Sequence, residues 1–395
     1  MQLRRSALAL VVATLAGVAP LLGQTDPEGS LDVDILLSYY DQDGDHSPVT
    51  GGIGSEALQV VSPVVVIGWR MNEKWTLSAD IGIDQMSSAS IGAIQMELSS
   101  ASIPSGDQRT FGNFRAARKL GRQTLGLTVG AAKEYDYRSV SYGLDWAMTF
   151  NRENTAVSAA VRRYDDAIDL IGIDGYGYQG EGLPVTTGSG DRTTTDLFFS
   201  ISQTLGRKTA ASIELLLSRQ EGYLATPFHE VILAPESAGS EGRRIAERLP
   251  DSRDRQAISL RLSHSFTDRL VQRVGYRLYD DDWGITAHTV DLETHFRLSA
   301  ARQMWVYPIV RFHTQSAADW FGLPATFAGS EAYLSSDWDL AETSTDKFGL
   351  GWSVTSLPGQ EWFGQLDRFE VRGTMYDRDD GLSGFTTSFG FGWTF

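Results

Sequence analysis

The sequence of 395 residues predicts an all-β protein, a transmembrane antiparallel β-barrel of about 16 strands, within a range of about 14–18. Segments with apolar residues at every second position alternate with polar breaks along the whole chain. After residue 23, no apolar run approaches the ~20 residues that a spanning helix needs. The chain also ends on a strand with an aromatic face. A chain that crosses a bilayer without helices does so as a closed barrel.

The final strand predicts where the protein resides. Phe391, Trp393 and Phe395 put aromatic side chains on one face, and Gly390 stands five residues before the end. This pattern resembles the β-signal that outer-membrane barrels present to their assembly machinery. On a soluble chain the same face would form an exposed apolar patch along an open edge. We therefore predict Gly390, Trp393 and Phe395 as assembly-signal residues, and the barrel assembly machinery as a partner.

The start of the chain agrees with this location. Arg4 and Arg5 precede an apolar run from Ser6 to Gly23, and the chain turns polar at Gln24. This order of basic, apolar and polar residues predicts a secretory signal peptide over residues 1–23. We expect residues 24–395 to form a single barrel domain in the outer membrane of a Gram-negative bacterium, in contact with its lipids.

Apolar residues of period two mark the strands in order. The predicted strands include residues 31–39, 75–83, 125–131 and 140–150, and the last ends at Phe395. In a soluble sandwich the apolar phase would face a core, whereas in a barrel it faces lipid and the other phase lines the lumen. Short breaks occur near 72–74, 121–122, 151–153, 206–208, 267–269 and 299–301, and long ones near 41–57, 87–108, 166–191, 221–252 and 316–342. The two sizes largely alternate, which predicts short periplasmic turns and long extracellular loops.

Composition excludes several classes of function. There is no cysteine, so disulfides, a thiol nucleophile and cysteine-ligated metals are excluded. The net charge of −16 argues against nucleic acid as a partner. The sequence carries no phosphate-cradling loop or paired-histidine metal motif. No cofactor is predicted.

The strand phase opposite the apolar one predicts the side chains that line the lumen. A charged side chain facing lipid at the midplane would cost roughly 2–4 kcal/mol, so these charges are expected to face inward. The predicted lumen and selectivity residues are Arg253, Arg255, Arg261, Arg273, Arg277, Asp291, Glu293, His295, Arg311, His313, Arg368, Glu370 and Arg372.

Two interpretations of this charged band remain open. It is either a cross-strand ladder of paired charges that fills and stiffens the lumen, or an arginine track that selects anionic solutes. Both signs of charge are present, which favours pairing. The sequence does not identify the arginine that stays unpaired.

Two other groups of residues suggest chemistry. Asp41, Asp43 and Asp45 surround Gly44 as in a calcium loop, but position 52 is glycine where that loop ends in glutamate. A solvated turn is therefore favoured over a metal site. The acidic run 280–282 with His288 suggests an acid–base group at the extracellular rim. A tight acidic turn between two strands explains the same residues.

Several stretches of the chain resemble a known bacterial family. They are Glu134–Ser139 with Phe150–Thr155, Glu221–Leu224, Glu247–Arg253, Tyr276–Ile285, His288–Glu293 and Gln315–Phe321. With these stretches the chain is similar, over nearly all of its length after the signal peptide, to the family catalogued as domain of unknown function 3570. The resemblance implies an outer-membrane barrel in a setting with small lipoproteins, thioredoxin-like proteins and flavin-attaching enzymes, and hence a link to extracytosolic redox systems.

Three hypotheses of function follow. The first is a non-enzymatic barrel that acts as a channel or as a membrane-embedded partner of a periplasmic protein or small lipoprotein. The second is a barrel hydrolase that uses the extracellular acidic and histidine cluster. The third is a structural barrel with a plugged lumen.

Overall fold

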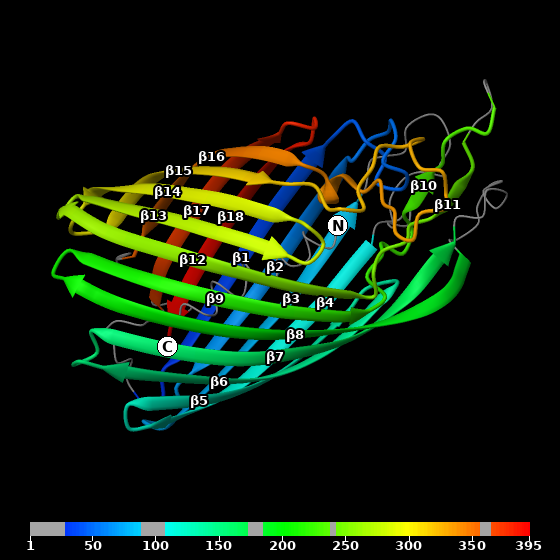
Figure 1. The fold of residues 1–395 in the computed structure, drawn as a ribbon. Coiled ribbons are helices and arrows are strands. Elements are labelled where there is room, and N and C mark those ends of the chain that lie inside the picture. The colour runs from blue at the N-terminus through cyan, green and yellow to red at the C-terminus, as the bar shows by residue number, and fades with distance from the viewer. Residues whose placement is uncertain (1–27, 88–106, 173–184, 238–241, 356–364) are drawn as a thin grey trace.

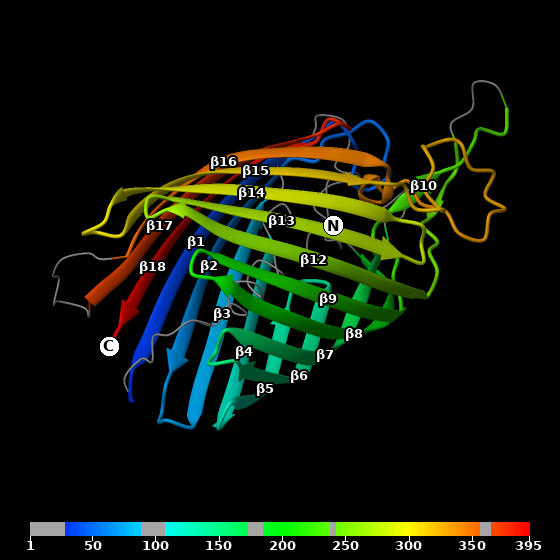
Figure 2. The same ribbon diagram turned by 60° about the vertical axis from the view of Figure 1, so that its left-hand side comes forward.

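The computed structural model describes residues 28–87, 107–172, 185–237, 242–355 and 365–395. Within them, sixteen antiparallel strands pair with their neighbours in chain order, and the last strand pairs with the first to close the ring. Figure 1 and Figure 2 show this barrel from two directions. The closed barrel of about sixteen strands that the sequence predicts is confirmed, and closure leaves the sheet without a free edge.

The strands of the ring differ in length but are continuous. In chain order they are β1 (Leu31–Asp43), β2 (Leu58–Trp69), β3 (Trp75–Ser87), β4 (Asp107–Leu120), β5 (Gln123–Lys133), β6 (Tyr137–Phe150), β7 (Thr155–Gly172), β8 (Val185–Gly206), β9 (Thr209–Gly222), β12 (Ser252–Thr267), β13 (Leu270–Asp281), β14 (Thr286–Ser299), β15 (Met304–Gln315), β16 (Thr343–Val354), β17 (Gln365–Arg378) and β18 (Ser383–Thr394). A separate hairpin of β10 (Glu230–Ile232) and β11 (Arg244–Ala246) lies between β9 and β12.

The outer face of the barrel is apolar and exposed. On β5, Leu125, Leu127 and Val129 are 47–53% exposed, while Thr128 between them is 5% exposed. Exposing so much apolar area to water would cost about 25 cal/mol per Å². Contact with lipid tails removes this cost, so the alternation identifies a lipid-facing belt. Among the described residues, no helix is long and apolar enough to cross a membrane.

The two ends of the barrel carry different connections. The end with the C-terminus has tight turns, such as residues 121–122, 207–208 and 268–269. The opposite end carries the long connections 44–57, 223–251 and 316–342. Figure 1 shows β10 and β11 there, and Figure 2 shows β10. This is the predicted asymmetry of periplasmic turns and extracellular loops.

Strands extend further into the loop end than the sequence indicated. β7 and β8 continue well into the region 166–191 that the sequence assigned to a loop. Asp166 lies opposite Arg192 there, and both side chains are buried. On β7 the apolar Ile168 faces inward and the outward phase carries Asp165 and Asp169, while on β8 residues 188–191 are glycine, serine and aspartate, so the outward apolar phase that marks a strand is missing. The connections 134–136, 282–285 and 379–382 at this end are also short.

The three long loops fold against one another into a unit that we call the loop cap, defined as residues 44–57, 223–237, 242–251 and 316–342. Its centre contains Val49, Val231 and Leu334, each at most 2% exposed. Backbone hydrogen bonds join the loops, from Glu230 N to Val49 O (2.7 Å) and from Leu334 N to Arg248 O (2.7 Å). A second apolar cluster, Leu224, Trp283, Ile285, Ala318 and Leu340, joins the cap to the turn between β13 and β14. The predicted signal peptide, 1–23, lies outside the described residues.

Candidate functional site in the barrel lumen

Strand register places each predicted lumen residue on the face opposite the lipid belt. On β12, the exposed Ile258, Leu260 and Leu262 alternate with Ser259 and Arg261. Cross-strand partners share a face, and the register carries this assignment around the wall. The inward residues are Arg253, Arg255 and Arg261 on β12, Arg273 and Arg277 on β13, Asp291, Glu293 and His295 on β14, Arg311 and His313 on β15, and Arg368, Glu370 and Arg372 on β17.

Most of these arginines meet a carboxylate on another strand or on their own. The nitrogen–oxygen distances are 2.5 Å for Arg253–Asp281, 3.2 Å for Arg261–Glu214, 3.7 Å for Arg273–Glu293, 2.5 Å for Arg311–Asp291, 2.5 Å for Arg368–Asp34 and 2.6 Å for Arg372–Glu370. Solvated pairs contribute only ~0–1 kcal/mol each. Pairing of the solvated arginines therefore orders their side chains more than it stabilises the fold, whereas the Arg253–Asp281 pair is buried.

Tyr307 of β15 organises a packed cluster on the lumen wall and is 1% exposed. Its hydroxyl donates to the Glu370 carboxylate, and Arg372 Nε donates to Tyr307 Oη (3.0 Å) and to Glu370 Oε1 (2.6 Å). The His295 ring stacks on the Tyr307 ring with centroids 4.3 Å apart. His295 Nε2 also lies 3.0 Å from Glu293 Oε2. Four of the predicted lumen residues are thus tied to one buried ring.

The place of Tyr307 depends on a glycine of the next strand. A Cβ atom on Gly351 would lie 2.2 Å from the Tyr307 ring. Because glycine leaves that space open, the ring lies flat over β16. Sequence reasoning missed Tyr307, since the phase of Trp305 and Tyr307 on β15 looked apolar rather than lumen-lining.

Two cations on this wall have neither a hydrogen bond nor an ion pair with any residue in the described ranges. They are Arg277 of β13 and Lys347 of β16. Arg255 also has no carboxylate within 4 Å in those ranges, but its guanidinium donates to Ser218 Oγ at 3.0 Å. Lys347 was not predicted. It lies between Asp346 and the exposed Phe348. The alternation of the apolar Phe348 and Leu350 could have indicated that Lys347, in the opposite phase, faces the lumen.

The two halves of the lumen carry opposite excess charge. On β12 to β17, which we call the basic wall, the inward cations are Arg253, Arg255, Arg261, Arg273, Arg277, Arg297, Arg311, Lys347, Arg368, Arg372 and Arg378, against Asp281, Asp291, Glu293 and Glu370. On β1 to β8, the acidic wall, the inward carboxylates are Asp32, Asp34, Asp80, Asp84, Asp145, Asp166 and Asp196, against Arg109, Arg115, Lys119, Arg162 and Arg192. The ring order puts β3 to β7 across from β13 to β17.

Lumen-facing charges keep much of their surface accessible. The side chains of Arg273, Arg261 and Arg311 are 56%, 48% and 48% exposed. Because these residues face inward, that exposure is to space inside the barrel. Around Arg261, Arg273 and Arg311, the described side chains therefore do not fill the lumen.

The aspartates considered for a metal do not converge. Asp41 accepts hydrogen bonds from Tyr39 Oη (2.6 Å) and Gln59 Nε2 (2.8 Å). Asp43 accepts from Gly44 N (2.9 Å) and Ser55 Oγ (3.1 Å), and Asp45 lies in the following loop. Within the described ranges, no group of three or more histidine, aspartate or glutamate side chains is arranged to hold a metal ion.

The acidic run considered for hydrolysis is divided between the faces of the sheet. Asp281 faces inward, pairs with Arg253 and accepts from Trp283 N (3.1 Å) and Ile285 N (2.9 Å), so it shapes the turn. Asp280 binds Thr286 Oγ1 (2.9 Å), and His288 binds Tyr276 Oη (2.8 Å) on the outer face. This separation does not support the enzyme hypothesis.

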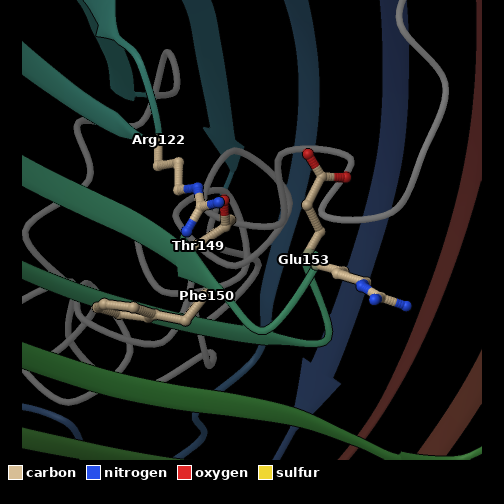
Figure 3. Close-up of a pocket in the computed structure, with 5 residues that line it drawn as sticks. Arg122, Thr149, Phe150 and Glu153 are labelled. Carbon is tan, nitrogen blue, oxygen red and sulfur yellow. The ribbon is translucent and has the colours of Figure 1, made fainter.

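A small hollow lies at the end with the tight turns. It is bounded by Arg122, Thr149, Phe150, Arg152 and Glu153. In Figure 3 the Arg122 side chain points toward Thr149 while the Glu153 carboxylate points away. The residues 151–153 have φ between 49° and 67°, which is the left-handed conformation of a strained tight turn. We assign this hollow no function.

The predicted assembly residues lie in the strand that closes the ring. Trp393 lies opposite Val33 of β1 and Leu366 of β17, and Gly390 lies opposite Leu36 and Glu370. Phe395 exchanges backbone hydrogen bonds with Leu31, at 2.9 and 3.1 Å. Their role as an assembly signal remains a prediction.

The loop cap contains one buried carboxyl group. Glu247 is 6% exposed and accepts from Ser335 Oγ and from Thr226 N (2.7 Å). Burial raises the pKa of Glu247 above its usual value, and the nearby His229 opposes that rise. Burial, together with the charge of Glu247, raises the pKa of Tyr223 to about 12. The protonation of Glu247 therefore depends on the packing of the cap around it.

Comparison with known proteins identifies the family of the chain and several solved structures to which it is similar. No curated protein matches the sequence significantly. Among solved structures, the chain is similar to a bacterial polysaccharide outer membrane secretin (9% identity, TM-score 0.49, 94% of this chain and 100% of that one). It is also similar to CdiB from Acinetobacter baumannii (10% identity, TM-score 0.48, 92% of this chain and 60% of that one). A third similar structure is the outer membrane protein opdK from Pseudomonas aeruginosa (8% identity, TM-score 0.42, 93% of this chain and 98% of that one).

The fold assignment rests on the closed strand order and the lipid belt rather than on these likenesses. Both features identify an outer-membrane β-barrel. The family described as "Protein of unknown function (DUF3570)" matches residues 2–384, and the chain belongs to this family.

Proposed function

We propose that the protein is a water-filled outer-membrane channel whose lumen favours anionic solutes along the basic wall. The observation that carries the proposal is the exposure of Arg261, Arg273 and Arg311 on the inner face of the barrel. A lumen closed by its own side chains would bury these groups. Rings of like charge select ions of the opposite sign in pores, and on this wall cations outnumber carboxylates.

Pairing and selectivity are compatible in this lumen. Six of the predicted arginines have carboxylate partners, which is the ladder interpretation. Arg277 and Lys347 have none in the described ranges. The ladder therefore holds the wall in place while the remaining cations set the sign of the local potential.

The test is conductance of the refolded barrel in a planar bilayer under a salt gradient. We expect stepwise openings with a reversal potential of the sign given by anion preference. Arg261→Ala and Arg277→Ala are each expected to reduce that preference. Arg118→Gln is the matched control, because Arg118 lies over the Trp75 ring on the outer face and its loss removes the same charge outside the lumen.

A correctly folded barrel that gives no conductance would overturn the channel. The membrane-embedded partner role, with a periplasmic protein or small lipoprotein of an extracytosolic redox system, would then be pursued by cross-linking in cells. If both arginine variants open with the ion selectivity of the wild type, the protein is still a channel but the basic wall does not set its selectivity.

A further inference from the structure

Two cations that have no partner among the described residues, and two paired arginines, lie near one another on the basic wall. We propose that Arg277, Lys347, Arg261 and Arg311 form a binding site for a compact multivalent oxyanion, such as a phosphate or polycarboxylate group. The use of this site in solute passage rests on the channel proposed above and names its solute class. Binding itself does not require conduction.

Strand register brings the four residues together. Arg311 lies opposite Asp291 on one side and Lys347 on the other, and Asp291 lies opposite Gly275. Gly275 in turn lies opposite Arg261 of β12. The row from Arg261 to Lys347 thus crosses five strands, with a glycine leaving space beside Asp291. Arg277 projects from β13 two residues along the same face, opposite Ser259 and Thr289.

The carboxylates near the cluster are already engaged. Glu214 is held by Arg261 at 3.2 Å, and Asp291 is held by Arg311 at 2.5 Å. Four cations therefore share two carboxylates, and the cluster keeps an excess of positive charge. Arg261 and Arg311 repel Arg277, which Glu214 attracts, and Arg311 and Arg372 repel Lys347, which Asp291 attracts. An anion placed between Arg277 and Lys347 would relieve this repulsion.

The available donors suit an oxyanion with several acceptor oxygens. Arg277 offers a planar fork that matches carboxylate or phosphate geometry, and Lys347 offers three donors on a flexible stem. Both side chains are partly buried, so their hydrogen bonds to an anion would be less screened than on the outer surface. His313, which is hydrogen-bonded to Thr289 Oγ1 at 2.8 Å, borders the same space.

The experiment is calorimetric titration of the detergent-refolded full chain with inorganic pyrophosphate at low ionic strength. We expect saturable binding to the wild type. The double variant Arg277→Gln/Lys347→Gln is expected to weaken it by at least about tenfold, since hydrogen bonds to charged groups are lost. Arg277→Lys and Lys347→Arg, which keep the charge, are expected to retain most of the affinity.

The matched control is Arg115→Gln on the acidic wall. Arg115 forms a bidentate pair with Asp145, at 2.9 and 2.5 Å; combined with Lys119→Gln on the same strand, its replacement removes two lumen charges, as the double variant does, but outside the site. Unchanged affinity in this control with loss in the double variant supports the site. Equal losses in both would mean a general field effect and would overturn it, as would the absence of saturable binding to the wild type.

Conductance measurements distinguish the proposed channel from the proposed anion-binding site. In a conducting barrel, pyrophosphate should reduce the chloride current of the wild type and leave that of the double variant unaffected. A barrel that binds pyrophosphate but does not conduct retains the site and overturns the channel. A barrel that conducts but neither binds pyrophosphate nor is blocked by it retains the channel and overturns the site.

Discussion

At the scale of single residues, Glu247 is a carboxylic acid buried in the loop cap, outside the membrane. Its carboxyl group is buried between two long connections and accepts hydrogen bonds from Ser335 and Thr226. Asp337 adds negative charge, whereas His229 adds opposing positive charge when protonated. Burial dominates this balance, because water solvates a carboxylate better than these few donors do.

We predict that the loop cap is more resistant to trypsin at about pH 5 than at about pH 8. The pKa of Glu247 is raised in the folded state, so folding favours the protonated form. That contribution is fully present below the unfolded pKa of ~4.3 and is lost as the pH rises through the folded pKa. Cleavage at the exposed Arg243, Arg244 and Arg248 measures cap opening, with an unfolded substrate as reference for protease activity.

Glu247→Gln supplies the control for this prediction. Glutamine keeps the shape and can accept from Thr226 N, but it does not titrate. The variant should show the higher resistance at both pH values. If it instead retains the full pH dependence of the wild type, another group controls the cap.

At the scale of elements, β15 and β16 are joined by the packing of Tyr307 over Gly351. A Cβ atom at position 351 would fall within the ring, at 2.2 Å. Moving the ring would also break the hydrogen bonds of Tyr307 with Glu370 and Arg372. Gly351 therefore allows the Tyr307 ring to pack against β16 while its hydroxyl is hydrogen-bonded to Glu370 and Arg372 of β17.

We predict that Gly351→Ala destabilises the folded barrel by about 1–3 kcal/mol, the usual cost of overpacking. Urea titration with folded and unfolded forms separated on gels measures this change. Gly68→Ala in β2 is the matched control, because a Cβ there meets only Asp32 Cβ at 3.9 Å. Equal stability of the two variants would mean that the Tyr307 ring moves freely.

At the scale of the whole molecule, closure depends on β18 between β17 and β1. Phe395 completes the pairing through its backbone contacts with Leu31. We predict that deletion of Phe395 lowers the amount of barrel inserted in the outer membrane of cells several-fold, while refolding in detergent is retained. Membrane fractionation with gel mobility measures both. Loss of detergent refolding as well would assign Phe395 a structural role instead of a signal role.

The period-two pattern was sufficient for the barrel and for the direction of its lumen residues. Strands such as β5 and β6 carry apolar residues on one face only, and there the register follows from the sequence. The pattern was insufficient where the lipid-facing phase is polar, as around Asp166 and Arg192. On β7 that phase carries Asp165 and Asp169 while Ile168 faces inward, so the extension of β7 and β8 resembled a loop.

The site was predictable in its residue types but not in its pairings. Arg261 meets Glu214 of β9, and Arg368 meets Asp34 of β1. Asp34 is brought close to Arg368 by closure of the ring, and Glu214 to Arg261 because β9 pairs directly with β12. Neither pairing can be read from the spacing of residues along the sequence. The loop cap was also missed, because it depends on contacts between loops far apart in the chain.

The separation of charge between the two walls has a consequence for how a solute would travel. A molecule with both a positive and a negative end meets opposite potentials on its two sides, and the resulting torque turns it across the axis of the barrel. Such a solute would pass sideways and in one preferred orientation. At ~0.1 M salt the Debye length is about 10 Å, so dilution should sharpen this alignment and concentrated salt should abolish it.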